Sequence, residues 1–300
     1  MTFLPIVDRE LRVAARLTAT YRNRSIIAGV VTFVAMVMFA LGAFSTSPSH
    51  VGSSMFWTLA YMALAFCLLE GVRKTADCLC EEKREGTLGL LFLTDLKGYD
   101  IVLGKLAAKS LSSIYGLLSV LPVLALSLLL GGITAGEYWR IVLALANILF
   151  FSLCAGMWVS CWSRDERQAM TASFMLVALW VAVPLLIGWH SLYPLSPVYA
   201  FEAGAARAYL FAPGDYWQSL GIAQGLSWAM LLWASLAVPH CWREEKFNAL
   251  SAQWWRRSPK MRPHDALRRA RRRAQMLDIN PAYWLAGRNP SQRIMLAVAI

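Results

Sequence analysis

Few residues of this 300-residue chain have the type and spacing that chemistry needs. The pair Cys78-x-Cys80 lacks the two-residue gap of zinc-binding cysteine pairs. The histidines are scattered, and none lies in an H-E-x-x-H or beside a G-x-S-x-G arrangement: His50, His190, His240 and His264. We therefore expect no catalytic residue, no metal site and no cofactor on this chain.

The stretch from Gly98 to Lys105 comes nearest to a phosphate-binding loop, but it does not meet the pattern. A P-loop needs four residues between its glycines and a Ser or Thr after its lysine. Here five residues separate Gly98 from Gly104, and Leu106 follows Lys105. The chain is therefore not expected to be an enzyme or to hydrolyse ATP itself.

The composition indicates what kind of protein has so few reactive groups. Hydrophobic residues make up 58% of the chain and charged residues 16%, against about 25% charged residues in soluble domains. The mean hydropathy is +0.48. This excludes a soluble, disordered or collagen-like chain. Because a backbone in lipid must satisfy its own hydrogen bonds, we predict an all-α, polytopic membrane protein.

Six apolar runs approach the length of about 20 residues that a helix needs to cross a bilayer. They cover residues 25–44, 54–72, 106–130, 141–162, 169–189 and 219–239. A seventh run, 294–300, is too short to span. The sequence thus predicts three parts: an N-terminal segment 1–24, a six-span helical bundle 25–239, and a basic tail 240–300 that ends in the incomplete seventh run.

The basic residues predict how the bundle is oriented. Of the 29 Lys and Arg residues, 27 lie in the segments that alternate on one side of the six spans. Lys and Arg accumulate on the cytoplasmic side of membrane proteins. We expect both termini to be cytoplasmic, at least through residue 290. The net charge of +11 then reflects topology and not binding to nucleic acid.

The segment before the first span has an amphipathic pattern. Val7 and Leu11 share one helical face, and Arg9, Arg12 and Arg16 lie on the other. This favours a helix lying in the membrane interface. The alternative is a basic flank that only enforces orientation, and both can hold.

The connection between the second and third spans is long and almost balanced in charge, with seven basic residues against six acidic ones from residue 73 to residue 109. Its first half is charged, and Gly86 then breaks the pattern. Thr87 can cap a short apolar helix over residues 88–93. Asp100 can cap the helix that leads into the third span. The pattern favours a docking element, and the alternative is an ordinary loop.

This connection resembles the coupling segment of permease subunits of type-2 ATP-binding-cassette (ABC) exporters. There, a Glu-rich segment with basic residues ends in Gly-Thr, a Leu-rich short helix follows, and a Gly-Lys pair enters the third span. The matching residues here are Glu81, Glu82, Lys83, Arg84, Glu85, Gly86, Thr87, Leu88, Leu90, Leu91, Gly104 and Lys105. Asp95-Leu96 departs from the pattern, since many relatives carry a Pro there.

The resemblance implies a function as well as a fold. The bundle would be the permease domain of an exporter in a bacterial inner membrane, and its coupling helix would contact a separate ABC ATPase subunit that binds ATP and Mg²⁺. The permease would work as a dimer with a second copy or a homologue, and efflux of an unidentified substrate would follow ATP hydrolysis. The alternative is a membrane anchor or assembly scaffold that transports nothing.

Polar residues inside the spans suggest packing roles. Glu70 lies near the end of the second span, and Arg73 follows one turn later, so we expect the two to pair or the carboxylate to snorkel. Asn147 in the fourth span is expected to hydrogen-bond between helices. The basic cluster of the tail at residues 268–273 favours anionic lipid headgroups over nucleic acid.

Overall fold

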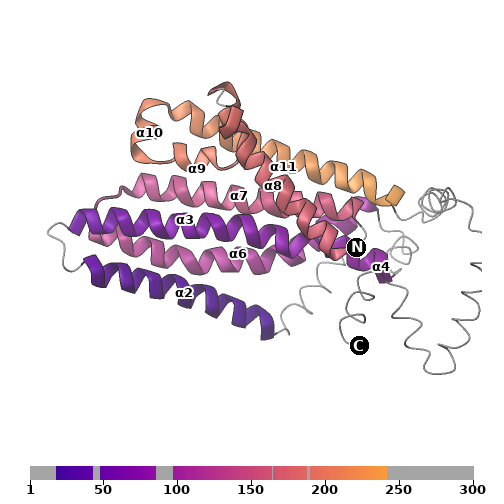
Figure 1. The fold of residues 1–300 in the computed structure, drawn as a ribbon, viewed down its shortest axis with the longest axis horizontal. Coiled ribbons are helices and arrows are strands. Elements are labelled where there is room, and N and C mark those ends of the chain that lie inside the picture. Colours follow the sequence, from indigo (N-terminus) through magenta and orange to yellow (C-terminus); the bar gives the residue numbers. More distant parts are fainter. Residues whose placement is uncertain (1–17, 43–47, 86–96, 164, 188–189, 242–300) are drawn as a thin grey trace, which may run out of the picture. The chain divides into compact units, whose positions relative to one another are not determined.

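A computed structural model describes residues 18–42, 48–85, 97–163, 165–187 and 190–241 (Figure 1). The chain divides into two units, Met1–Arg243 and Glu244–Ile300, and every described residue belongs to the first. Several predictions fall on residues outside the described ranges and stay predictions. They concern Arg9, Arg12, Arg16, Gly86, Thr87, Leu88, Leu90, Leu91 and the tail from residue 242.

Helices account for the described part of the chain, which contains no strand. The long ones follow the six predicted spans in order: α2 Thr18–Gly42, α3 Pro48–Thr75, α6 Gly98–Leu130, α7 Ala135–Trp162, α8 Glu166–Ile187 and α11 Pro213–Cys241. Four short helices connect them: α4 Cys78–Glu85, the 3-10 helix η1 His190–Leu195, α9 Tyr199–Ala203 and α10 Ala206–Phe211. The predicted all-α class is confirmed.

Five segments within these helices are long and apolar enough to cross a membrane: 24–42, 49–83, 98–130, 135–162 and 213–239. Helix α8 coincides with the fifth predicted span but is not among the five. Most helices extend beyond the apolar runs that predicted them, because hydropathy detects only the part that lipid would surround. Helix α6 begins at Gly98, so Asp100 lies in its first turn, where its carboxylate accepts the Lys97 N–H at 3.2 Å.

The direction of each helix follows from its contacts. Tyr216 on α11 bonds to Arg140 of α7 near the starts of both helices, and Cys161 contacts the Ala234 carbonyl near their ends, so the two are parallel. Helix α6 runs the opposite way along α3. The start of α2, helix α4, the start of α6 and the end of α11 therefore share one end of the bundle, here called the α4 end (Figure 1).

Helices α3 and α7 pack closely through small residues. A Cβ atom added to Gly71 would overlap the Ser152 hydroxyl, and one added to Gly156 would overlap the Thr75 hydroxyl. These hydroxyls bond across the interface, Thr75 to the Leu153 carbonyl at 2.9 Å and Ser152 to the Cys67 carbonyl at 2.7 Å. Small residues spaced four apart on both helices allow this close approach, which is typical of membrane helices.

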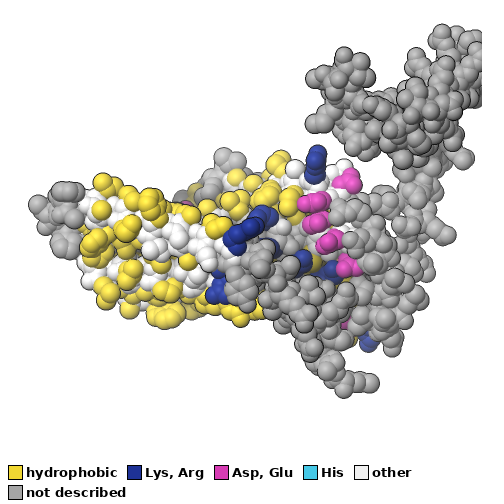
Figure 2. All heavy atoms as spheres, turned by 90° about the horizontal axis from the view of Figure 1, so that it is seen from below, with side chains coloured by type: hydrophobic (Ala, Val, Ile, Leu, Met, Phe, Trp, Pro, Cys, Tyr) yellow, Lys and Arg dark blue, Asp and Glu magenta, His cyan; other side chains and the backbone are white. Residues whose placement is uncertain are grey.

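The surface of the described part is mostly apolar. Phe33 and Met36 on α2 are 61% and 62% exposed. Many large hydrophobic residues on the other helices are exposed as well. Figure 2 shows hydrophobic side chains along most of the bundle, with charged side chains gathered toward one end. This distribution matches a bundle surrounded by lipid, since a water-facing surface of this kind would be unfavourable.

Candidate functional site

The candidate site is centred on α4, Cys78–Glu85, which follows α3 after a short turn. The sequence predicts a charged stretch here and a helix only after Gly86, so α4 differs from the prediction. A signal was present: Asp77, a residue type common at N-caps, directly precedes it. Cys78, Leu79 and Cys80 are fully buried against the bundle. The charged residues that follow project from a helix that is already anchored.

The end of α7 and the start of α4 satisfy each other's backbone groups. The Ser160 hydroxyl of α7 accepts the N–H groups of Leu79 at 2.9 Å and Cys80 at 3.2 Å, in the first turn of α4. These are groups that a helix cannot satisfy itself. Because Ser160 belongs to another helix, this cap joins α4 to α7.

Lys83 makes the reciprocal contact. Its ammonium group donates to the carbonyls of Ser160 at 3.2 Å and Ser163 at 3.4 Å, and also to that of Cys161. Helix α7 ends at Trp162, so these are carbonyls of its last turn, where the helix dipole favours a cation. A movement of α4 along or away from α7 would break both sets of bonds.

An ion pair joins α4 to α6. The Lys105 ammonium lies 2.6 Å from the Glu82 carboxylate and donates to the Cys78 carbonyl at 3.3 Å. The side chains are 8% and 20% exposed, so water screens the pair weakly. The family pattern includes Glu82 and the Gly104-Lys105 pair in one segment. In the structure, Glu82 and Lys105 are in contact.

The other predicted coupling residues have different positions. Glu81 is exposed on α4, and Gly104 is buried inside α6. Arg84 and Glu85 lie within α4, but their side chains are outside the described set. Glu81 is therefore the described acidic residue of α4 that is most accessible to a partner.

The start of α7, at the opposite end of the bundle, holds the short helices α9 and α10. Glu137 accepts the Ala206 N–H at 3.1 Å, at the first residue of α10. Arg140 donates to the Gly204 carbonyl at 3.0 Å and lies 4.1 Å from the ring centre of Tyr209. One continuous helix, α7, thus contacts α4 at one end and the α9–α10 connection at the other.

A further bond fixes α9 to α11. The Tyr199 hydroxyl donates to the Asp215 carboxylate at 3.3 Å. Burial raises the pKa of this hydroxyl above its ordinary value, and the negative charge of Asp215 raises it further. Tyr199 therefore stays protonated at neutral pH and can act as the donor.

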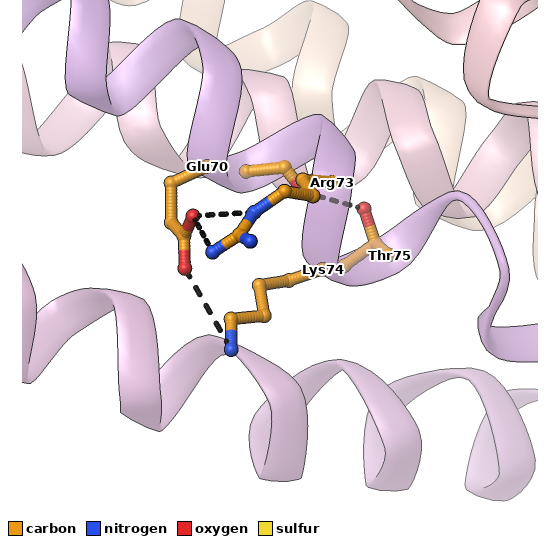
Figure 3. A network of polar contacts seen from close by, with 5 residues as sticks. Glu70, Arg73, Lys74 and Thr75 are labelled. Atoms are coloured by element: carbon orange, nitrogen blue, oxygen red, sulfur yellow. Dashed lines mark hydrogen bonds and ion pairs between the residues drawn. The ribbon is translucent and has the colours of Figure 1, made fainter. Parts of the chain in front are cut away.

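Two predictions about polar residues in the spans are confirmed. Glu70 pairs with Arg73 at 2.6 Å, and Lys74 lies 3.6 Å from its second oxygen (Figure 3). Asn147 donates to the Leu220 carbonyl at 2.8 Å, which links α7 to α11. Both residues therefore stabilise packing between or within helices.

The contacts of the site join helix α4 to α7 and α6. Among the described residues, no three His, Cys, Asp or Glu side chains converge as metal ligands. Five cysteine side chains are buried in the bundle: Cys67, Cys78, Cys80, Cys154 and Cys161. The arrangement can transmit force, because α4 is bonded to two long helices that continue through the bundle.

Comparison with known protein families gives a match over most of the chain. Residues 21–229 match the family model described as ABC-2 family transporter protein. The matched range includes α3, α4, α6, α7 and α8 in full, together with most of α2 and α11. The comparison with curated proteins finds no match.

Proposed function

Because the chain belongs to the ABC-2 family of transporter proteins, we propose that it is the permease subunit of an ATP-driven exporter whose ATPase is a separate chain. In this proposal ATP and Mg²⁺ bind to that ATPase, and two permease subunits form the transporter. The α4 end faces the cytoplasm of a bacterial cell. We leave the substrate class open, because the described buried charges of Glu70, Lys105 and Glu137 all bond within the protein.

The observation that carries the proposal is the attachment of α4. Its anchoring residues, Lys83 and Glu82, bond to α7 and α6, while Glu81 is exposed at the end of the bundle. A docking element needs both properties: an accessible charged surface to orient a partner and a rigid connection to the part that must move.

The path from α4 to the far end is α7. Closure of the ATPases would displace α4, and Ser160 and Lys83 would pass the displacement to the end of α7. Glu137 and Arg140 at the start of α7 would then move the α9–α10 connection. Since α3 is interlocked with α7, the two would move as one body.

Purification of the tagged chain from native membranes tests the proposal. We expect an ABC ATPase to co-purify and to hydrolyse ATP. Charge reversal in Glu81→Lys should lower this association at least tenfold, because like charges at a docking surface are unfavourable. The matched control is Arg207→Glu, a charge reversal of an exposed residue on α10.

The control should leave the association unchanged. Equal association for Glu81→Lys and the wild type would contradict the role of α4. Absence of any ATPase, with a bundle that does not respond to nucleotide, would instead support the membrane anchor or scaffold.

A further inference from the structure

Four basic residues lie on α2, α3 and α6 in the turns nearest the α4 end, and we call this set the basic junction: Arg24, Arg73, Lys74 and Lys109. The three helices meet one layer deeper in the bundle. There, a Cβ atom on Gly116 of α6 would lie 2.8 Å from the Phe66 ring of α3 and 3.6 Å from Ile27 of α2. This layer fixes how the helices face one another.

Helical periodicity then places the basic residues on the facing sides. Arg24 precedes Ile27 by about one turn, Arg73 follows Phe66 by about two turns, and Lys109 precedes Gly116 by about two turns. Since α3 runs opposite to α2 and α6, all three steps lead toward the same end of the bundle. Arg and Lys side chains are long, so those of the three helices can contact one shared ligand.

The junction carries an excess of positive charge. The carboxylate oxygens of Glu70 lie 2.6 Å from the guanidinium of Arg73 and 3.6 Å from the ammonium of Lys74 (Figure 3). Arg24 stacks on the Tyr115 ring at 5.0 Å, and its buried Nε has no hydrogen-bond partner. Among the described residues, neither Arg24 nor Lys109 has a carboxylate partner. Within the described part of the chain, the Glu70 carboxylate therefore contacts two of the four cations of the junction, Arg73 and Lys74.

The surroundings of the junction are apolar. Ile26 on α2 and Ile114 and Leu118 on α6 are exposed on two of the helices that carry it. In Figure 2, Lys and Arg side chains likewise lie beside the hydrophobic surface of the bundle. A ligand here must combine negative charge with apolar chains that lie along the helices.

We propose that the basic junction binds the phosphate of an anionic lipid headgroup, with the acyl chains along α2 and α6. Arg and Lys are the usual donors to phosphate, and basic clusters at membrane surfaces attract anionic lipids. The unpartnered Arg24 Nε would gain an acceptor. The inference requires only that the helices cross a membrane, so it can fail or hold independently of the transport proposal.

Native mass spectrometry of the purified chain tests this inference. The protein is mixed with phosphatidylglycerol or phosphatidylcholine of identical acyl chains, and the lipid retained is compared. We expect the wild type to prefer phosphatidylglycerol. In the variant Lys74→Gln/Lys109→Gln, the ratio of retained phosphatidylglycerol to phosphatidylcholine should fall roughly 30-fold, given the usual contribution of two basic residues.

Two variants serve as controls. Lys74→Arg/Lys109→Arg keeps the charge and should keep the preference, and Arg207→Gln removes a charge from α10 and should not change it. An unchanged preference in the Gln variant would overturn the proposal. So would displacement of phosphatidylglycerol by millimolar inorganic phosphate, because the site would then bind a soluble anion.

A second measurement needs no variant and therefore does not depend on the variant folding. Phosphatidylglycerol with a photoreactive headgroup is cross-linked to the wild-type protein, and the labelled peptides are identified. We expect labels on peptides that contain Arg24 or Lys109. Labels confined to other peptides would contradict the inference.

Discussion

Individual side chains at the α4 end satisfy groups that helices leave open. Ser160 accepts N–H groups at the start of α4, and Lys83 donates to carbonyl groups at the end of α7. Glu82 neutralises the buried Lys105. Of these, the sequence singled out Lys83, Glu82 and Lys105, through a family pattern and not through their geometry. Nothing in the sequence marks Ser160, because a serine near a helix end has many possible partners.

Lys83→Met should destabilise the protein by about 1–3 kcal/mol, since hydrogen bonds from a charged donor are lost at the end of α7. Unfolding in detergent, followed by circular dichroism, measures this. Lys83→Arg keeps a charged donor and should recover most of the loss. A Met variant as stable as the wild type would show that the three carbonyls do not need the cation.

The Glu82–Lys105 pair should behave as a coupled unit. Glu82→Gln leaves Lys105 buried without its counter-ion, which costs about 3 kcal/mol by the measured behaviour of buried pairs. Lys105→Met should cost a similar amount. The double variant should cost less than the two singles added together, by about 1 kcal/mol or more. Additive costs in this double-mutant cycle would mean that the pair contributes no interaction energy.

At the scale of helices, the sequence predicted what hydropathy can detect. The six long helices follow the predicted order, while their ends extend into polar segments, as at the start of α6. Helix α4 was missed because it is charged, and its stability comes from contacts with α7 that lie about 80 residues away. The short helices α9 and α10 lie between the fifth and sixth predicted spans, in a connection that hydropathy does not mark as helical.

The interlock of α3 and α7 predicts unequal effects of the same substitution. Gly71→Ala would place a Cβ atom 2.9 Å from the Leu153 backbone nitrogen, besides the overlap with Ser152. We expect a loss of about 1–3 kcal/mol, typical of overpacking. Gly225→Ala on α11 is the control, because nothing lies within 4 Å of its added Cβ.

The control should be neutral or slightly stabilising, since Ala favours a helix over Gly. Thermal unfolding of the two variants in the same detergent gives the comparison. Equal stability of both variants would mean that α3 and α7 do not pack as closely as described.

At the scale of the whole molecule, the charge distribution predicts the orientation of the bundle, and the family match supports a permease. Cys67, Cys78, Cys80, Cys154 and Cys161 are buried, so an engineered exposed cysteine can be compared with the labelling of the unsubstituted protein to test orientation.

A membrane-impermeant maleimide should label Glu81→Cys only after the cells are permeabilised, because the α4 end is proposed to be cytoplasmic. It should label Arg207→Cys in intact cells. Unsubstituted protein measures the background from native cysteines. The reverse pattern would invert the proposed topology and remove the basis for ATPase contact at α4.

We propose that nucleotide acts on the bundle through α4 and α7. A spin label on Arg207→Cys, in the complex with the co-purified ATPase, reports on the far end of that path. Its spectrum should change when ATP and vanadate trap the ATPase, and Lys83→Met should suppress the change while hydrolysis continues. Identical spectra with and without trapped nucleotide would contradict the account.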